Sequence, residues 1–359
     1  MQFAFHGSPK DLCMATFENR LSSAMQQAGH ELSEPVPGVG LVFSHVDVEH
    51  LRPFRRHAQA TYVIALLRLD GTPEDFLRTA YPYMIRSLAN LLIAVVGPEN
   101  ETETYFLTLE RGYYRIAPHA DPQAHMREVV RRLTPLATSH LIIDNVFDAD
   151  LEPDLWQGDA ATQELGRAAK VLDAWNLLPA PFPMQEMLSA EDFRHVQRLY
   201  QIGGLSYGNL SQRRDRRRYW MSASGVNKAH LRDVGQEVLL VKDFDHQRKA
   251  MRLSVPPEIK PRRVSVDAIE HFMIYREHPQ VGAIIHVHAW MEGIPSTDVN
   301  YPCGTIELAT AVADLVRVAP DPSRAVIGLR NHGMTITGHS LDDIMERVDG
   351  KILPQVPMS

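Results

Sequence analysis

The sequence predicts a mixed α/β protein, of the α+β type, with more than one domain. Stretches with apolar side chains at helical spacing alternate along the chain with short apolar runs typical of strands, and turn-forming residues separate them. The chain has 359 residues, which is long enough for two hydrophobic cores. We therefore expect two domains, each built from helices packed on a sheet.

The first part of the chain carries the elements of an α+β layer domain. A helix is predicted over residues 10–27, and strand-like runs follow at 40–46 and 60–69. The remaining elements are a helix over 73–88, a strand over 91–96, a hairpin around Arg111-Gly112, a helix over 122–136 and a strand over 140–147. We place this domain at residues 1–150, and no motif in it indicates a chemical role.

A proline-rich stretch indicates the boundary between the domains. The helix predicted over 159–175 is followed by Leu177-Leu-Pro-Ala-Pro-Phe-Pro183, and a helix cannot continue through these prolines. We assign residues 151–184 to this helix and linker, and residues 185–359 to the second domain. A further helix over 191–200 is expected to lead into that domain.

The composition excludes several classes of protein. The net charge of -7 provides no general attraction for nucleic acid. The two cysteines, Cys13 and Cys303, argue against a disulfide framework. The first residues lack the features of a secretory signal, and no apolar run approaches the roughly 20 residues that a membrane helix needs. We therefore expect a cytoplasmic protein that binds neither nucleic acid nor membranes.

Two histidines lie close together in the apolar run Val281-Gly-Ala-Ile-Ile-His-Val-His-Ala289. The run has the pattern of a buried strand, and side chains two residues apart on a strand emerge on the same face. His286 and His288 therefore point together. Two imidazoles in an apolar interior cost desolvation free energy unless both are satisfied, and a divalent metal satisfies them through their lone pairs. A pair of core histidines bonded to backbone or water is the alternative.

A third histidine, His332, lies in a predicted turn. Strands are expected over 325–329 and 334–337, with Asn331-His-Gly333 between them. Functional side chains concentrate in such loops. Three histidines with an open fourth position are typical of a catalytic rather than a structural metal site.

The second half of the chain resembles the class II aldolase and adducin superfamily. The resemblance rests on motifs that occur in the family's order: Gly208-Asn-Leu-Ser-Gln-Arg213, Ser222-Ala-Ser-Gly-Val-Asn-Lys228, Val264-Ser-Val-Asp267, His271-Phe-Met-Ile-Tyr275, His286-Val-His288, Gly304-Thr-Ile-Glu-Leu-Ala309 and Asn331-His-Gly-Met-Thr-Ile-Thr-Gly338. It implies a three-layer α/β/α sandwich around a largely antiparallel sheet. It also implies a cyclic homotetramer with zinc at the subunit interface.

Residue by residue, the resemblance implies a metal site and an anion site. His286, His288 and His332 match the metal ligands. Zinc is expected, with Fe²⁺, Mn²⁺ and Co²⁺ as alternatives, because three imidazoles do not discriminate among these ions. The residues that match the family's phosphate-binding positions are Gly208, Asn209, Ser224, Gly225 and Ser265. Glycine lets backbone N–H groups approach an anion, and Asn and Ser add donors, although the same residues also favour ordinary turns.

Asp267 matches the position of the family's catalytic glutamate. We expect Ser265 to cap a helix that runs to His278, which places Asp267 in the first turn of that helix. A first-turn acid usually only complements the helix dipole, but next to a metal it can also move a proton as an enediolate forms and collapses. Aspartate is one methylene shorter than glutamate, and Val266 replaces a second serine of the family's aldolases, which weakens the expectation of a phosphate.

Three functions remain open. The first is a metal-dependent lyase that performs retro-aldol or decarboxylating cleavage on a small hydroxy-carbonyl substrate bearing a phosphate or carboxylate, with Asp267 as general acid and base. Epimerase or dehydratase chemistry passes through related intermediates. The second is an Fe(II)-dependent oxidoreductase on the same histidines. The third is a non-catalytic adducin-like module, and the presence of all three histidines counts against it.

Overall fold

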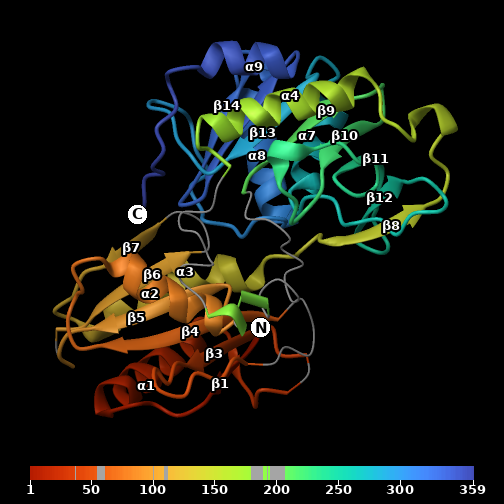
Figure 1. Ribbon diagram of the computed structural model, residues 1–359. Coiled ribbons are helices and arrows are strands. Elements are labelled where there is room, and N and C mark those ends of the chain that lie inside the picture. Colours follow the sequence, from red (N-terminus) through yellow and green to blue (C-terminus); the bar gives the residue numbers. More distant parts are fainter. Residues whose placement is uncertain are drawn as a thin grey trace. The chain divides into compact units, whose positions relative to one another are not determined.

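The computed structural model describes residues 1–36, 38–54, 61–99, 101–108, 112–178, 189–191, 193–194 and 207–359. The chain divides into two compact units, each with its own sheet (Figure 1). Most of the proline-rich stretch and most of the helix predicted over 191–200 lie outside the described residues. Among the helices that are described, none combines the length and the apolar character needed to cross a membrane.

The N-terminal unit is formed mainly by residues 1–138 and contains a seven-stranded sheet. The strands, in spatial order, are β2 (Glu31–Leu32), β1 (Gln2–His6), β3 (Leu41–His45), β4 (Tyr62–Leu69), β5 (Leu91–Val96), β6 (Glu103–Thr108) and β7 (Tyr113–Ile116). The strands from β2 to β5 pair in parallel, and β6 and β7 are antiparallel. This region therefore has the predicted layers of helices and strands, but its mixed sheet is mostly parallel.

Helices cover both faces of this sheet. Helices α1 (Leu12–Gln27) and α3 (Pro122–Thr138) share an apolar core with one face, to which Phe106 belongs. The neighbouring Tyr105 stacks on Phe76 of α2 (Phe76–Arg86), with ring centroids 4.6 Å apart. Because successive side chains of a strand point to opposite faces, α2 lies on the other face.

The second unit, residues 139–184 and 197–357, contains an eight-stranded sheet. In spatial order the strands are β14 (Val326–Leu329), β15 (Gly333–Gly338), β13 (Ala283–Val287), β9 (Asn209–Arg213), β10 (Tyr219–Ser222), β11 (Val238–Asp245), β12 (Ala250–Ser254) and β8 (Asp144–Asp148). Every neighbouring pair is antiparallel except β12 and β8. The predicted largely antiparallel sheet is confirmed.

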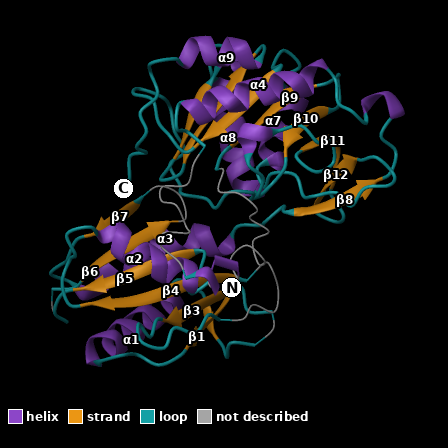
Figure 2. Cartoon of the chain, in the orientation of Figure 1, coloured by secondary structure: helices purple, strands orange, loops and turns teal. Residues whose placement is uncertain are grey.

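Two helical layers enclose the second sheet (Figure 2). One contains α4 (Ala160–Ala174) and α9 (Leu341–Val348), and the other contains α7 (Ala268–Glu277) and α8 (Ile306–Val318). Two successive residues of β9 show that the layers lie on opposite faces. The Ser211 hydroxyl bonds to His271 of α7, whereas Gln212 donates to Glu164 of α4. Short 3₁₀ helices at Pro153–Leu155, Lys228–His230 and Pro322–Arg324 complete the unit.

Strand β8 places the division between the units earlier than the sequence suggested. It pairs in parallel with β12, from Asp144 opposite Ala250 to Asp148 opposite Ser254. Helix α4 also packs within the second unit's core. The second unit therefore begins at Ser139 rather than at residue 151 or 185. The local pattern could not reveal this, because an edge strand is assigned to a sheet by its distant partner and not by its own residues.

Two close backbone approaches fix the strands at the centre of the second sheet. Gly208 has φ +69°, and a Cβ atom there would lie 2.5 Å from the carbonyl oxygen of His286. Gly333 approaches the carbonyl of Val287 in the same way. Glycine at both positions lets β9 and β15 lie tightly against β13. As a result, His286 lies directly opposite Asn209 on one side and Thr335 on the other.

We predict that Gly208→Ala lowers the free energy of unfolding by clearly more than Gly293→Ala. Both glycines have positive φ, +69° and +73°, so both substitutions carry a backbone cost of about 1–2 kcal/mol. Only at Gly208 does the added Cβ also meet backbone, since nothing lies within 4 Å of it at Gly293. Urea denaturation of the two variants measures the difference. Equal losses of stability would show that β9 is not held tightly against β13.

Candidate metal centre

Three buried histidines converge at one end of strand β13. His286 lies near the end of this strand, and His288 follows directly after it. His332 occupies the turn between β14 and β15, where the preceding Asn331 has φ +59°. The three side chains are 1%, 7% and 4% exposed. The structure therefore brings together two neighbouring histidines and one that is 44 residues further along the chain than His288.

The geometry of the three rings is that of a common site. The Nε2 atoms of His288 and His332 are 3.2 Å apart, and one ring nitrogen from each histidine lies within 4.8 Å of the others. The ring centroids are 4.8–5.2 Å apart, with the ring planes inclined at 61–70°. Two nitrogens bound tetrahedrally to one zinc ion would be separated by about 3.3 Å. The nitrogens of His288 and His332 thus have the spacing of two ligands on one ion, and a ring nitrogen of His286 lies within 4.8 Å of them.

The hydrogen bonds of His286 leave one lone pair directed into the site. Its Nδ1 lies 3.2 Å from the carbonyl oxygen of Met334. A carbonyl only accepts, so Nδ1 carries the proton and Nε2 keeps its lone pair. The Nε2 atom is buried and has no hydrogen-bond partner in the described part of the chain. Burial, together with the charges of His332 and Lys228, places the pKa of His286 well below its ordinary value, so the ring is neutral.

Asp267 is linked to this site through Asn209, which lies opposite His286, and its carboxylate is held by two hydrogen bonds. Its carboxylate accepts a bond of 2.7 Å from the Asn209 side chain and one of 3.2 Å from the backbone N–H of Gly304. The prediction that Ser265 caps the helix is wrong. Helix α7 begins at Ala268, no side chain caps it, and Ser265 contributes only its carbonyl to the N–H of Ala268. Asp267 is itself the N-cap residue, and its carboxylate binds Asn209 and Gly304 instead of capping the helix.

The residues predicted to hold an anion are arranged in two groups. Gly208 and Asn209 lie against β13, where the Asn209 amide already donates to Asp267. Ser224 and Gly225 form a turn, with φ +68° at Gly225, and Ser265 lies on the adjacent segment. The backbone N–H groups of Ser224 and Ser265 are bonded to the carbonyls of Arg263 and Ser222. Their hydroxyls have no hydrogen-bond partner among the described residues and are therefore available to a ligand.

Two further buried charges belong to this region and were not assigned a role from the sequence. Lys228 is 3% exposed, and burial lowers its pKa to about 8 although the charge of Asp267 opposes this. Glu270 is 2% exposed, and burial raises its pKa to about 8, with Asp267 adding to the rise. Sequence signals for both existed. Lys228 ends a motif of the resemblance, and Glu270 follows Asp267 by three residues, which places both on one side of a helix.

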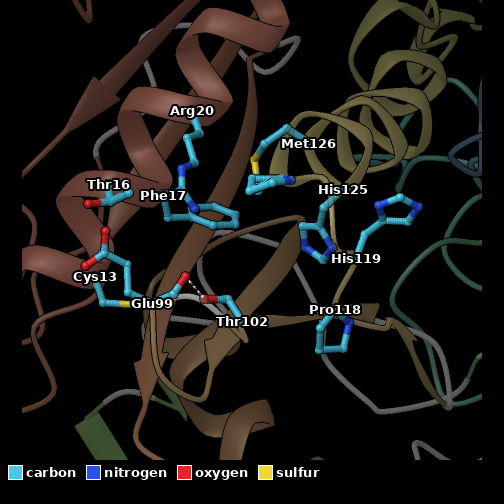
Figure 3. Close-up of a pocket in the computed structure, with 11 residues that line it drawn as sticks. Cys13, Thr16, Phe17, Arg20, Glu99, Thr102, Pro118, His119, His125 and Met126 are labelled. Carbon is cyan, nitrogen blue, oxygen red and sulfur yellow. Dashed lines mark hydrogen bonds between the residues drawn. The ribbon is translucent and has the colours of Figure 1, made fainter.

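A hollow in the N-terminal unit offers no comparable donor set. It has a volume of about 30 Å³, enough for one water molecule, and lies between α1 and the segments near α3 (Figure 3). Cys13 and His125 are among its lining residues. Both ring nitrogens of His125 are already bonded, to the Thr104 hydroxyl at 2.8 Å and the Ala117 carbonyl at 3.2 Å.

Comparison with known proteins identifies similar chains. Methylthioribulose-1-phosphate dehydratase from Xanthomonas campestris pv. campestris (strain B100) is 31% identical over 88 residues, which is 24% of this chain and 35% of that protein. The dehydratase of the same name from Sodalis glossinidius is 34% identical over 82 residues, 23% of this chain and 35% of that protein. The chain thus spans about a third of the length of these curated relatives.

Solved structures show weaker likeness. YgbL from Klebsiella pneumoniae is 18% identical, with a TM-score of 0.33 over 53% of this chain and 83% of that chain. An aldolase II superfamily protein from Pseudomonas syringae is 16% identical, with a TM-score of 0.36 over 55% of this chain and 73% of that chain.

A family model matches the segment that contains most of the site. Residues 193–297 match the Class II Aldolase and Adducin N-terminal domain. This segment includes Asn209, Asp267, His286 and His288, whereas His332 lies beyond its end. The segment from 193 to 297 is therefore similar to the class II aldolase and adducin family.

Proposed function

We propose that this protein is a metal-dependent lyase acting on a small hydroxy-carbonyl substrate that bears a phosphate or a carboxylate. The convergence of His286, His288 and His332 carries the proposal, together with Asp267, which is bonded to Asn209 opposite His286. Zinc is the ion we expect, with Fe²⁺, Mn²⁺ and Co²⁺ as alternatives, because imidazole binds all of them. The family resemblance supports a homo-oligomer, and the presence of only two cysteines is compatible with a cytoplasmic protein.

The residues present fit a resident divalent ion. His286 is neutral and offers a buried lone pair that no other described group uses. Three protein ligands leave a position open for a substrate, as catalytic rather than structural sites do. When bound, such an ion polarises neighbouring carbonyl and hydroxyl oxygens and stabilises the negative charge of an enediolate.

Asp267 is the residue we propose to move the proton. Asn209 and Gly304 hold its carboxylate in one orientation, which keeps a proton acceptor fixed near the histidines. In carbon–carbon cleavage it accepts the proton of the substrate hydroxyl as the bond breaks, and returns it to carbon. Lys228 adds a positive charge to the same buried region, and the hydroxyls of Ser224 and Ser265 can donate to the anionic group of a substrate.

Elimination of water is the second candidate, and the names of the matched relatives favour it. Here Asp267 would accept a proton from the carbon next to the carbonyl and return it to the departing hydroxyl, which leaves as water. Both reactions require the same acceptor and the same ion, so the products distinguish them.

We predict that the metal-loaded full chain converts at least one member of a panel of hydroxy-carbonyl phosphates and hydroxy acids without consuming oxygen. Mass spectrometry separates the outcomes, since carbon–carbon cleavage yields two fragments and elimination yields one product lacking water. Protein treated with a chelator is the control and should be inactive. Oxygen uptake would instead support an Fe(II)-dependent oxidoreductase, and the absence of turnover with metal bound would support an adducin-like binding module.

We predict that Asp267→Asn keeps bound metal but lowers kcat by about 10²–10⁴-fold, the usual contribution of a general acid or base. Asparagine has nearly the same size but cannot accept the proton. His286→Ala is the matched variant and should lose metal and activity together. Metal content and kcat are measured on both proteins. Loss of metal from Asp267→Asn would make Asp267 chiefly a metal ligand.

A further inference from the structure

Glu270 is a buried carboxyl group that the proposed reaction does not use. It lies in the first turn of α7 and is 2% exposed. One oxygen, Oε1, accepts a hydrogen bond of 2.6 Å from the Thr335 hydroxyl. The other, Oε2, is buried without a hydrogen-bond partner among the described residues. Burial of a carboxyl with so few partners costs free energy that an apolar side chain would not cost, which indicates a function other than packing.

Thr335 connects Glu270 to the metal centre. It lies directly opposite His286 in the pairing of β15 with β13, and its Oγ1 is 3.5 Å from His286 Nδ1. The hydroxyl has a single proton, which it donates to Glu270, so its lone pairs remain available to the Nδ1–H group. His286 is therefore held on its Nδ1 side by two acceptors, the Met334 carbonyl and a hydroxyl that is polarised by a carboxyl.

A second negative group favours the binding of a cation at the histidines. Imidazole ligands carry no negative charge with which to compensate a divalent ion, and Lys228 adds another positive charge to the same buried region. Asp267 supplies one negative charge, which does not balance a dication and an ammonium. Glu270 supplies a second one, separated from the His286 ring by the Thr335 hydroxyl, and such outer partners of a ligating histidine commonly support it.

We propose that Glu270 is a positioning residue for the metal centre, which acts through Thr335 to orient His286 and to raise the affinity of the site for a divalent cation. The inference rests on the metal site of the proposed function and is independent of the reaction performed there. Without a cation the buried carboxyl is unfavourable, and burial accordingly raises its pKa to about 8. The Glu270 carboxyl should therefore destabilise the metal-free protein and favour the metal-bound protein.

We predict that Glu270→Gln weakens Co²⁺ binding by about 10–100-fold, the usual effect of removing a partner of a ligating histidine. The amide retains the size and still accepts from Thr335, so the metal-free variant should melt at the same or a higher temperature than the wild type. A purely structural role would lower that temperature instead. Competition with a chelator measures the Co²⁺ dissociation constant of the full chain, and thermal unfolding measures the metal-free protein.

A pair of Thr335 variants and a control variant test the inference independently of Glu270→Gln. Thr335→Val removes the connecting hydroxyl and should also weaken Co²⁺ binding, whereas Thr335→Ser keeps the hydroxyl and should bind like the wild type. Glu277→Gln is the control on the same helix, where Glu277 pairs with Arg317 at the surface, and it should leave binding unchanged.

Unchanged Co²⁺ affinity in Glu270→Gln overturns the inference, as does a lower melting temperature of its metal-free form. If that variant does not fold, equal affinities of Thr335→Val and Thr335→Ser overturn it. A wild-type chain that binds no Co²⁺, Zn²⁺ or Fe²⁺ would remove the proposed function and this inference together. If the wild-type chain binds metal no more tightly than Glu270→Gln and Thr335→Val, this inference fails and the proposed function stands.

Discussion

The second unit depends on a single electrostatic constraint: three imidazole rings share a buried interior and direct ring nitrogens at one another. The 3.2 Å between the Nε2 atoms of His288 and His332 would bring two lone pairs together unless a proton or a cation lies between them. A proton can serve only one such pair. It cannot also satisfy the buried Nε2 of His286, whereas one divalent ion accepts all three lone pairs.

The sheet provides this arrangement through strand β13. It carries His286 and leads directly into His288, and the strands on either side supply what surrounds them. On one side, β15 brings Thr335, and the turn before β15 brings His332. On the other, β9 brings Asn209, which holds Asp267. Glycines 208 and 333 permit the close approach of these strands, so the packing of the backbone and the chemistry of the site have a common origin.

Features that depend on neighbouring residues could be predicted from the sequence, whereas features that depend on segments far apart in the chain could not. His286 and His288 were predicted to point together because the two-residue period of a strand is a local property. The turn at His332 was visible in its own residues, and the strands on both sides of it are observed. Their convergence needed the pairing of β13 with β15, which the family resemblance implied but spacing alone did not. Strand β8 was assigned to the wrong unit because its partner, β12, lies about 100 residues away.

The errors at individual residues have equally specific causes. Ser265 fits the preferences for a helix cap, but helix α7 begins later because Asp267 directs its carboxylate to Asn209 and Gly304. Lys228 and Glu270 resemble ordinary surface charges in the sequence, and only their burial reveals them as part of the site. Their places in the motif and in the helix were visible in the sequence, but burial of a single charged residue depends on tertiary packing.

The most direct test of the shared cation is X-ray absorption spectroscopy of the full chain purified with its native metal. The account predicts about one first-row divalent ion per chain, with a scattering pattern that requires three imidazole ligands. A chain that holds no stoichiometric ion, or an ion coordinated mainly by sulfur or carboxylate, would contradict it.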